Sequence, residues 1–111
     1  MKRVLVLLAA AGLCTALAVP ALAGTRTASV GDNYFVRKGR PVTLRIHPRS
    51  VLRFDWVGRG RHNVVVARGP QRFRSPLKSS GTWSRRFTRR GTYLLVCTIH
   101  PAEMRLNVVV R

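Results

Sequence analysis

The chain has 111 residues and a formal net charge of +18, with 21 lysines and arginines against three acidic residues. This length is enough for one small domain and too small for two. A field this positive favours anionic partners and surfaces, and it makes their binding depend on salt, but it does not identify the partner.

Residues 1–23 have the three parts of a secretory signal peptide. Residues 1–3 are positively charged, residues 4–19 are almost wholly apolar, and Ala21-Leu22-Ala23 matches the small-x-small cleavage pattern. We therefore expect cleavage before Gly24 and export to the periplasm or the extracellular space. The apolar stretch is shorter than the roughly 20 residues that a spanning helix needs. An uncleaved membrane anchor is the alternative.

Residues 24–111 form the predicted mature domain. Its net charge is +16, because two of the cations, Lys2 and Arg3, lie in the signal. It contains one cysteine, Cys97, so no internal disulfide can form even though an exported compartment would permit one. A lone exported cysteine needs another reason to be present, unless it is a small buried hydrophobe.

The pattern after the signal is that of an all-β protein. Apolar residues alternate or form short β-branched runs between Gly, Pro and Ser. The expected strands are residues 27–30, 33–36, 42–46, 51–56, 64–67, 82–87, 92–97 and 106–111. Eight short strands in one small domain indicate a sandwich or a closed barrel. Alternation places Leu52, Phe54 and Trp56 together on the core face of their strand.

Metal-ligating side chains gather where the strand over residues 92–97 is expected to end. Cys97, His100 and Met104 supply a thiol, an imidazole and a thioether within eight residues, and His62 heads another β-branched run far upstream. Two imidazoles, one thiolate and a distant thioether are the ligand set of a blue-copper electron-transfer site. Zinc is the alternative, and it would leave Met104 with little purpose.

The spacing of these residues suits a rigid site. A strand that ends at Cys97 places the thiolate at the end of a sheet, and His100 can turn back onto the same ion. Pro101 stiffens the loop because it fixes its φ angle and removes a backbone donor. His62 would tie this loop to another strand, so that metal binding also stabilises the fold. His47 has no Cys or Met nearby, and we interpret it as a surface or structural residue.

The sequence resembles the cupredoxin family of small type 1 blue-copper proteins, such as plastocyanin, pseudoazurin and amicyanin. The resemblance is carried by His62-Asn63-Val64 and by residues 91–101, and it extends over nearly all of residues 24–111. It implies a Greek-key β-sandwich of about eight short strands with one Cu(I)/Cu(II) ion near one end.

The same resemblance implies a role for each ligand. His62, Cys97 and His100 would be the equatorial ligands and Met104 the axial one. Three residues separate His100 from Met104, whereas family members commonly have two or four, so Met104 as a core residue stays open. The resemblance also implies that Asn63 hydrogen-bonds to Thr98 and holds the two ligand segments together.

We expect a monomeric, exported one-electron carrier that exchanges electrons through His100 with an acidic redox partner: a cytochrome, a dehydrogenase or an oxidase. One alternative is copper buffering or delivery outside the cytoplasm, and another is a metal-free cationic domain that binds polyanions. We expect no enzyme, because no carboxylate pair, phosphate-binding glycine loop or Ser-His-Asp arrangement is present. There is no signature of specific nucleic-acid binding, although association with anionic surfaces is open.

Overall fold

The computed structural model of the chain describes residues 23–111. The predicted signal peptide, residues 1–23, lies outside the described residues except for Ala23. In the part of the chain that the structure describes, no helix is long and apolar enough to cross a membrane.

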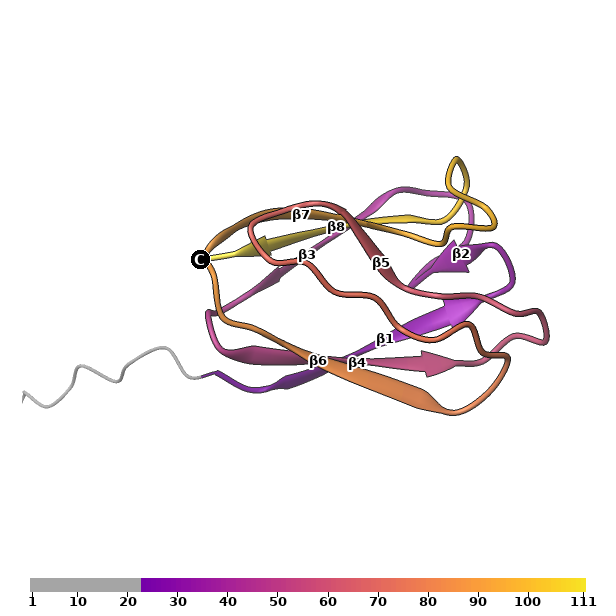
Figure 1. Ribbon diagram of the computed structural model, residues 1–111, viewed down its shortest axis with the longest axis horizontal. Helices are drawn as coiled ribbons and strands as arrows, with labels where there is room; N and C mark the ends of the chain where they lie inside the picture. Colours follow the sequence, from indigo (N-terminus) through magenta and orange to yellow (C-terminus); the bar gives the residue numbers. More distant parts are fainter. Residues whose placement is uncertain (1–22) are drawn as a thin grey trace, which may run out of the picture.

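Within residues 23–111, eight strands form two four-stranded sheets that lie face to face (Figure 1). One sheet has the order β2-β1-β4-β6 and the other the order β3-β8-β7-β5. The strands are β1 (Thr25–Gly31), β2 (Tyr34–Phe35), β3 (Val42–Ile46), β4 (Ser50–Trp56), β5 (Val65–Arg68), β6 (Thr82–Phe87), β7 (Gly91–Val96) and β8 (Arg105–Val110). The all-β sandwich predicted from the sequence is confirmed, and a closed barrel is not what the strands form.

Strand direction brings two distant connections to the same end of the sandwich. β1 and β4 are parallel neighbours in one sheet, and β7 is antiparallel to both β5 and β8 in the other. Figure 1 shows that β4 and β7 both run away from the end that holds the C-terminus. The segment after β4 and the loop between β7 and β8 therefore meet at the opposite end.

The core follows from the alternation of apolar residues. Leu52, Phe54 and Trp56 of β4 are all buried, as predicted. On the facing side, Phe87 of β6 packs edge-on against Tyr93 of β7, with 5.0 Å between the ring centroids. These contacts join the two sheets, so the ends of β4 and β7 give firm support to the loops that extend from them.

The strand bounds differ from the expected ones for local reasons. β1 begins at Thr25, two residues early, because it pairs in parallel with β4 from that residue onward. β2 shrinks to two residues because Asn33 and Val36 have φ angles of 69° and 66°, which no extended strand contains. β7 ends at Val96, so Cys97 is the first residue beyond the strand.

Candidate metal centre

The loop between β7 and β8 folds back on itself through its own backbone. The amide of His100 donates to the carbonyl of Cys97 at 3.2 Å, and the amide of Met104 donates to the carbonyl of His100 at 2.9 Å. The amide of Cys97 donates to the carbonyl of Met104 at 3.3 Å, which closes the loop. Two consecutive turns thus hold a thiol, an imidazole and a thioether in one compact segment.

His62 reaches the same end of the sandwich from the connection between β4 and β5. Its amide donates to the carbonyl of Lys78 at 2.9 Å, and its carbonyl accepts from the amide of Lys78 at 3.1 Å. The indole nitrogen of Trp56 also donates to that carbonyl, at 3.0 Å. Because three hydrogen bonds fix its backbone and its side chain is 2% exposed, His62 has little freedom to move.

The side chains of these segments converge. The Sγ atom of Cys97 lies 3.9 Å from Nδ1 of His62. The rings of His62 and His100 lie 5.3 Å apart, centroid to centroid. Cys97 and Met104 are both fully buried in the core, whereas 28% of the His100 side chain is exposed. The site therefore has a buried floor and one imidazole that reaches the surface.

The thiol and imidazole pair has the spacing of two ligands that share one ion. With a bond of about 2.3 Å to the thiolate, about 2.1 Å to the nitrogen and about 120° between them, the two donor atoms are about 3.8 Å apart. Sulfur and imidazole donors also suit copper in both oxidation states. The residues present thus fit a soft transition-metal ion.

The side chains of the four predicted ligands do not already surround one common point. Within residues 23–111, no three His, Cys, Asp or Glu side chains already stand as a metal-binding group. The donors meet in pairs: His62 with Cys97 and His62 with His100. The assignment of His62, Cys97, His100 and Met104 as metal ligands stays a prediction. The full burial of Met104 agrees equally with an axial ligand and with a core residue.

Asn63 and Thr98 join the two ligand-bearing segments. The side-chain nitrogen Nδ2 of Asn63 donates to Oγ1 of Thr98 at 3.0 Å, and Oδ1 of Asn63 accepts from the backbone amide of Thr98 at 2.9 Å. The residues thus make the contact that the resemblance implies. Each is the direct neighbour of a predicted ligand, so the contact fixes the separation of His62 and Cys97.

Asp32, in the turn between β1 and β2, contributes a contact that the sequence motifs do not indicate. Its Oδ1 atom lies 3.3 Å from Nε2 of His62 and accepts from the backbone amides of Arg59 and Gly60 at 2.9 and 2.8 Å. The hydrogen bond from the Gly60 amide, and after it the contact with the His62 ring, holds the pKa of the Asp32 carboxyl below its ordinary value. The imidazole of His62 is therefore held between a carboxylate and a thiol.

Comparison with solved structures identifies the fold that carries these residues. The chain superposes on the copper-containing nitrite reductase of Thermus scotoductus SA-01 with a TM-score of 0.62 and 27% identity, over 85% of this chain and 23% of that one. A Cu(I) structure of an amicyanin variant gives a TM-score of 0.62 with 23% identity, over 79% of this chain and 83% of that one. The chain has the cupredoxin fold.

A third cupredoxin neighbour extends the likeness. The purple cupredoxin of Nitrosopumilus maritimus gives a TM-score of 0.56 with 22% identity, over 62% of this chain and 77% of that one. No protein-family model matches the sequence, and no curated protein matches it. The resemblance to cupredoxins that the sequence motifs indicate is therefore confirmed through structure. The nitrite reductase is far longer than this chain, which matches only 23% of its length.

In this cupredoxin fold, the sequence motifs identified the segments that meet, and Asp32 is the site residue that they missed. A sequence signal was available in the two glycines of Gly58-Arg59-Gly60, whose small size permits a close approach of another segment. Nothing in the sequence, however, says which residue approaches. Asp32 lies 30 positions before His62, and the parallel pairing of β1 with β4 brings the two together.

Proposed function

We propose that this cupredoxin domain is an exported type 1 copper protein that carries one electron at a time between redox partners and is not an enzyme. The observation that carries the proposal is the buried Cys97 thiol beside Nδ1 of His62, with the partly exposed His100 ring next to the His62 ring. His62, Cys97 and His100 would hold one copper ion, with Met104 as the axial ligand. When bound, copper supplies exchange between Cu(I) and Cu(II).

Burial of the donor atoms favours an electron carrier over a copper-delivery protein. Cys97 is inaccessible and His62 is nearly so, and the backbones of both ligand segments are held by hydrogen bonds. Transfer of the metal to another protein would require an incoming ligand to reach these atoms. Transfer of an electron requires only contact with the edge of His100, and a rigid site reorganises little when its charge changes.

Exposed apolar side chains lie in the segments that carry or support the ligands. The large hydrophobic residues that the described chain exposes are Val57, Leu77 and Ile99. Val57 begins the connection that contains His62, Leu77 precedes its backbone partner Lys78, and Ile99 precedes His100. Apolar surface beside an exposed ligand suits brief docking of a partner, because it associates without strong directional bonds.

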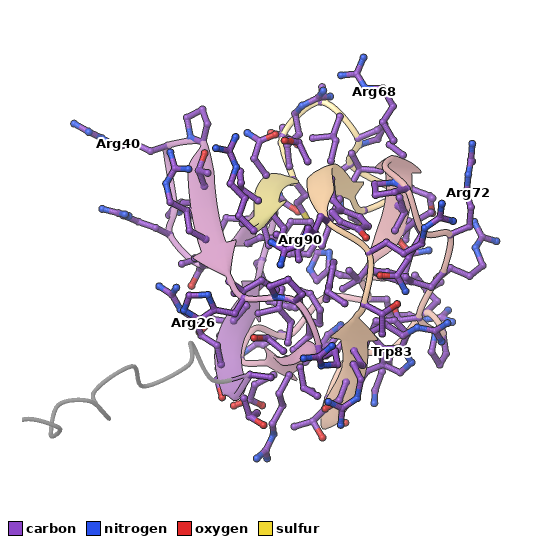
Figure 2. All side chains as sticks on the ribbon, turned by 90° about the vertical axis from the view of Figure 1, so that its left-hand side faces the viewer. Arg26, Arg40, Arg68, Arg72, Trp83 and Arg90 are labelled. Carbon is purple, nitrogen blue, oxygen red and sulfur yellow. The ribbon has the colours of Figure 1, made fainter. Side chains whose placement is uncertain are left out.

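The charges of the surface favour an acidic partner. In residues 23–111, the close contacts of carboxylates with basic side chains are to histidines, so the arginines and lysines are not neutralised by acidic side chains. Figure 2 shows that Arg40, Arg68 and Arg72 project outward on different sides. A groove of about 600 Å³ beside Ala102 and Glu103 of the ligand loop is lined by Arg37, Lys38, Arg40, Arg68 and Arg105. We propose that an acidic cytochrome, dehydrogenase or oxidase docks here.

Three features of the proposal rest on the sequence. The signal pattern of residues 1–23 supports export to the periplasm or the extracellular space. The strong positive charge supports a monomer, since two copies would repel each other. The same charge supports loose association with anionic surfaces, without selection of a nucleic-acid sequence.

Visible absorption tests the proposal directly. Residues 24–111, which contain all eight strands, are expressed, loaded with Cu(II) and measured before and after a mild reductant. We expect an intense blue band that bleaches on reduction and returns on oxidation. Cys97→Ser should abolish the band, and His62→Gln should abolish it or strongly shift it.

The matched control is His47→Gln, which removes a histidine that lies away from the ligand segments. His47 is exposed and its ring contacts the carbonyl of Arg111, near the end of β8. This variant should keep the blue band unchanged. A folded wild-type protein with no blue band would contradict the copper proposal and would favour zinc or a metal-free polyanion binder.

A further inference from the structure

The carboxylate of Asp32 is held firmly although about half of its side chain is exposed. Oδ1 accepts from the amides of Arg59 and Gly60, and Oδ2 accepts from the amide of Arg59 at 3.2 Å. Two backbone amides therefore fix the carboxylate before it meets His62. A surface aspartate without such contacts would turn freely in water.

Glycines create the room for this arrangement. A Cβ atom at Gly58 would overlap the Asp32 carboxylate, and a Cβ atom at Gly60 would lie 3.2 Å from Oδ1 and 3.1 Å from Nε2 of His62. Any larger residue at position 58 would have to displace the aspartate. The segment before His62 is thus built to admit a carboxylate against its backbone.

The contact determines which nitrogen of His62 carries the proton. An ionised carboxylate is an acceptor and has no proton to donate. The 3.3 Å contact to Nε2 therefore places the imidazole proton on Nε2. The lone pair of Nδ1 is then free, and Nδ1 is the atom that faces Sγ of Cys97.

We propose that Asp32 is a positioning residue of the metal site, which fixes the orientation and tautomer of His62 and favours the oxidised ion. This inference rests on the proposed copper function. Cu(II) with one thiolate and two neutral imidazoles has a local charge of one positive unit, whereas Cu(I) with the same ligands is neutral. The fixed negative charge of the Asp32 carboxylate beside His62 therefore stabilises Cu(II) relative to Cu(I).

The second carboxylate near the site is less well placed for this role. Oε1 of Glu103 lies 4.0 Å from Nδ1 of His100, and two thirds of its side chain is exposed. Water screens such a contact, and in the part of the chain that the structure describes the backbone amides bonded to a carboxylate are those of Arg59 and Gly60 on Asp32. The asymmetry assigns the orienting function to Asp32.

The test compares Asp32→Asn with Asp55→Asn in the copper-loaded protein. Both remove one negative charge, but Asp55 lies on β4 opposite Thr82 in the adjacent strand β6, and in the described residues the carboxylate that contacts the His62 ring is that of Asp32. Asparagine at position 32 keeps an oxygen for the amides of Arg59 and Gly60, so the turn should persist. The measurements are Cu(II) affinity by chelator competition and the Cu(II)/Cu(I) reduction potential.

Asp32→Asn should weaken Cu(II) binding about tenfold and leave Cu(I) binding nearly unchanged. A tenfold change for one oxidation state converts to a rise of about 59 mV in the one-electron potential. Asp55→Asn should change neither quantity appreciably. Gly58→Ala keeps the charge but displaces the carboxylate, so it should shift both quantities in the same direction as Asp32→Asn. Equal effects of the two aspartate variants would overturn the proposal.

A measurement without copper separates this inference from the proposed function. Nitrogen-15 NMR of the metal-free wild-type protein at mildly alkaline pH reports the tautomer of His62. We expect the proton on Nε2, and a loss of this preference in Asp32→Asn. A proton on Nδ1 in the wild-type protein would overturn the positioning role, whether or not the protein turns blue with copper.

Discussion

Asn63 and Thr98 are linked by a reciprocal pair of hydrogen bonds across 35 positions of the sequence. One bond runs from the Asn63 side chain to Oγ1 of Thr98 at 3.0 Å, and the other from the Thr98 amide to the Asn63 side chain at 2.9 Å. Both bonds join groups of the protein itself and need no metal ligand. The separation of His62 from Cys97 is therefore set by the protein before a metal binds.

Asn63→Ala removes both bonds and should lower the free energy of unfolding of the metal-free protein by about 1 to 2 kcal/mol. It should also weaken copper binding, because the ligand segments are then free to separate. Urea denaturation and chelator competition measure the two effects. Asn107→Ala, at a half-buried position of β8, is the control. Metal affinity equal in the two variants would contradict the linking role of Asn63.

Met104→Leu distinguishes an axial ligand from a core residue. Leucine has nearly the same volume, so the fully buried position should lose less than about 1.5 kcal/mol of stability. If the thioether coordinates copper, its loss removes electron density from the ion and should raise the reduction potential while the blue band persists. Voltammetry of the copper-loaded variant measures this. A potential identical to that of the wild type would assign Met104 to the core alone.

Much of the fold could be predicted, because it depends on local pattern. The meeting of the ligand segments was predicted on other grounds, namely the combined donor set of His62, Cys97, His100 and Met104 and the family resemblance. Alternation in β4 identified Leu52, Phe54 and Trp56 as core residues, and all three are buried. The contact of Asp32 with His62 could not be predicted, because it depends on how β1 lies beside β4. Strand pairing across the sheet is a property of the whole chain, and no spacing between residues 32 and 62 encodes it.

The expected strand over residues 33–36 was predicted too long because a positive φ angle ends it at Val36. Val36 adopts a φ angle of 66°, which its β-branched side chain disfavours. Local propensity predicts a strand there, but the backbone amide of Val36 instead donates to the carbonyl of Ser29 at 2.8 Å. A tertiary hydrogen bond at the end of the hairpin thus outweighs a local preference.

Electron exchange should depend on ionic strength in opposite ways for oppositely charged reagents. The net charge of the predicted mature domain should speed encounter with an anionic oxidant such as hexacyanoferrate(III) and slow encounter with a cationic one such as hexaammineruthenium(III). Raising the salt concentration from about 10 mM to about 500 mM should lower the first rate by about tenfold and raise the second. Stopped-flow absorption at the blue band gives both rates. Two rates that respond alike to salt would contradict electrostatic steering.

Tyr93 connects the core to the turn before β7. Its hydroxyl lies 2.7 Å from the carbonyl of Arg89 and 2.9 Å from Oε1 of Gln71. Burial raises the pKa of the Tyr93 hydroxyl above its ordinary value of 10.0, although Arg89 partly opposes this. The folded protein therefore retains this proton at a pH at which the unfolded chain has begun to release it.

The free energy of unfolding should fall as the pH rises past about 10, because the unfolded state then binds fewer protons than the folded state. Tyr93→Phe removes this contribution, so its stability should depend less steeply on pH than that of the wild type. The variant should also lose about 1 kcal/mol at neutral pH, since the hydroxyl no longer bonds to the turn. Urea denaturation at several pH values measures both effects, with Tyr34→Phe as the control. Parallel curves for Tyr93→Phe and the wild type would show that Tyr93 is not the group responsible.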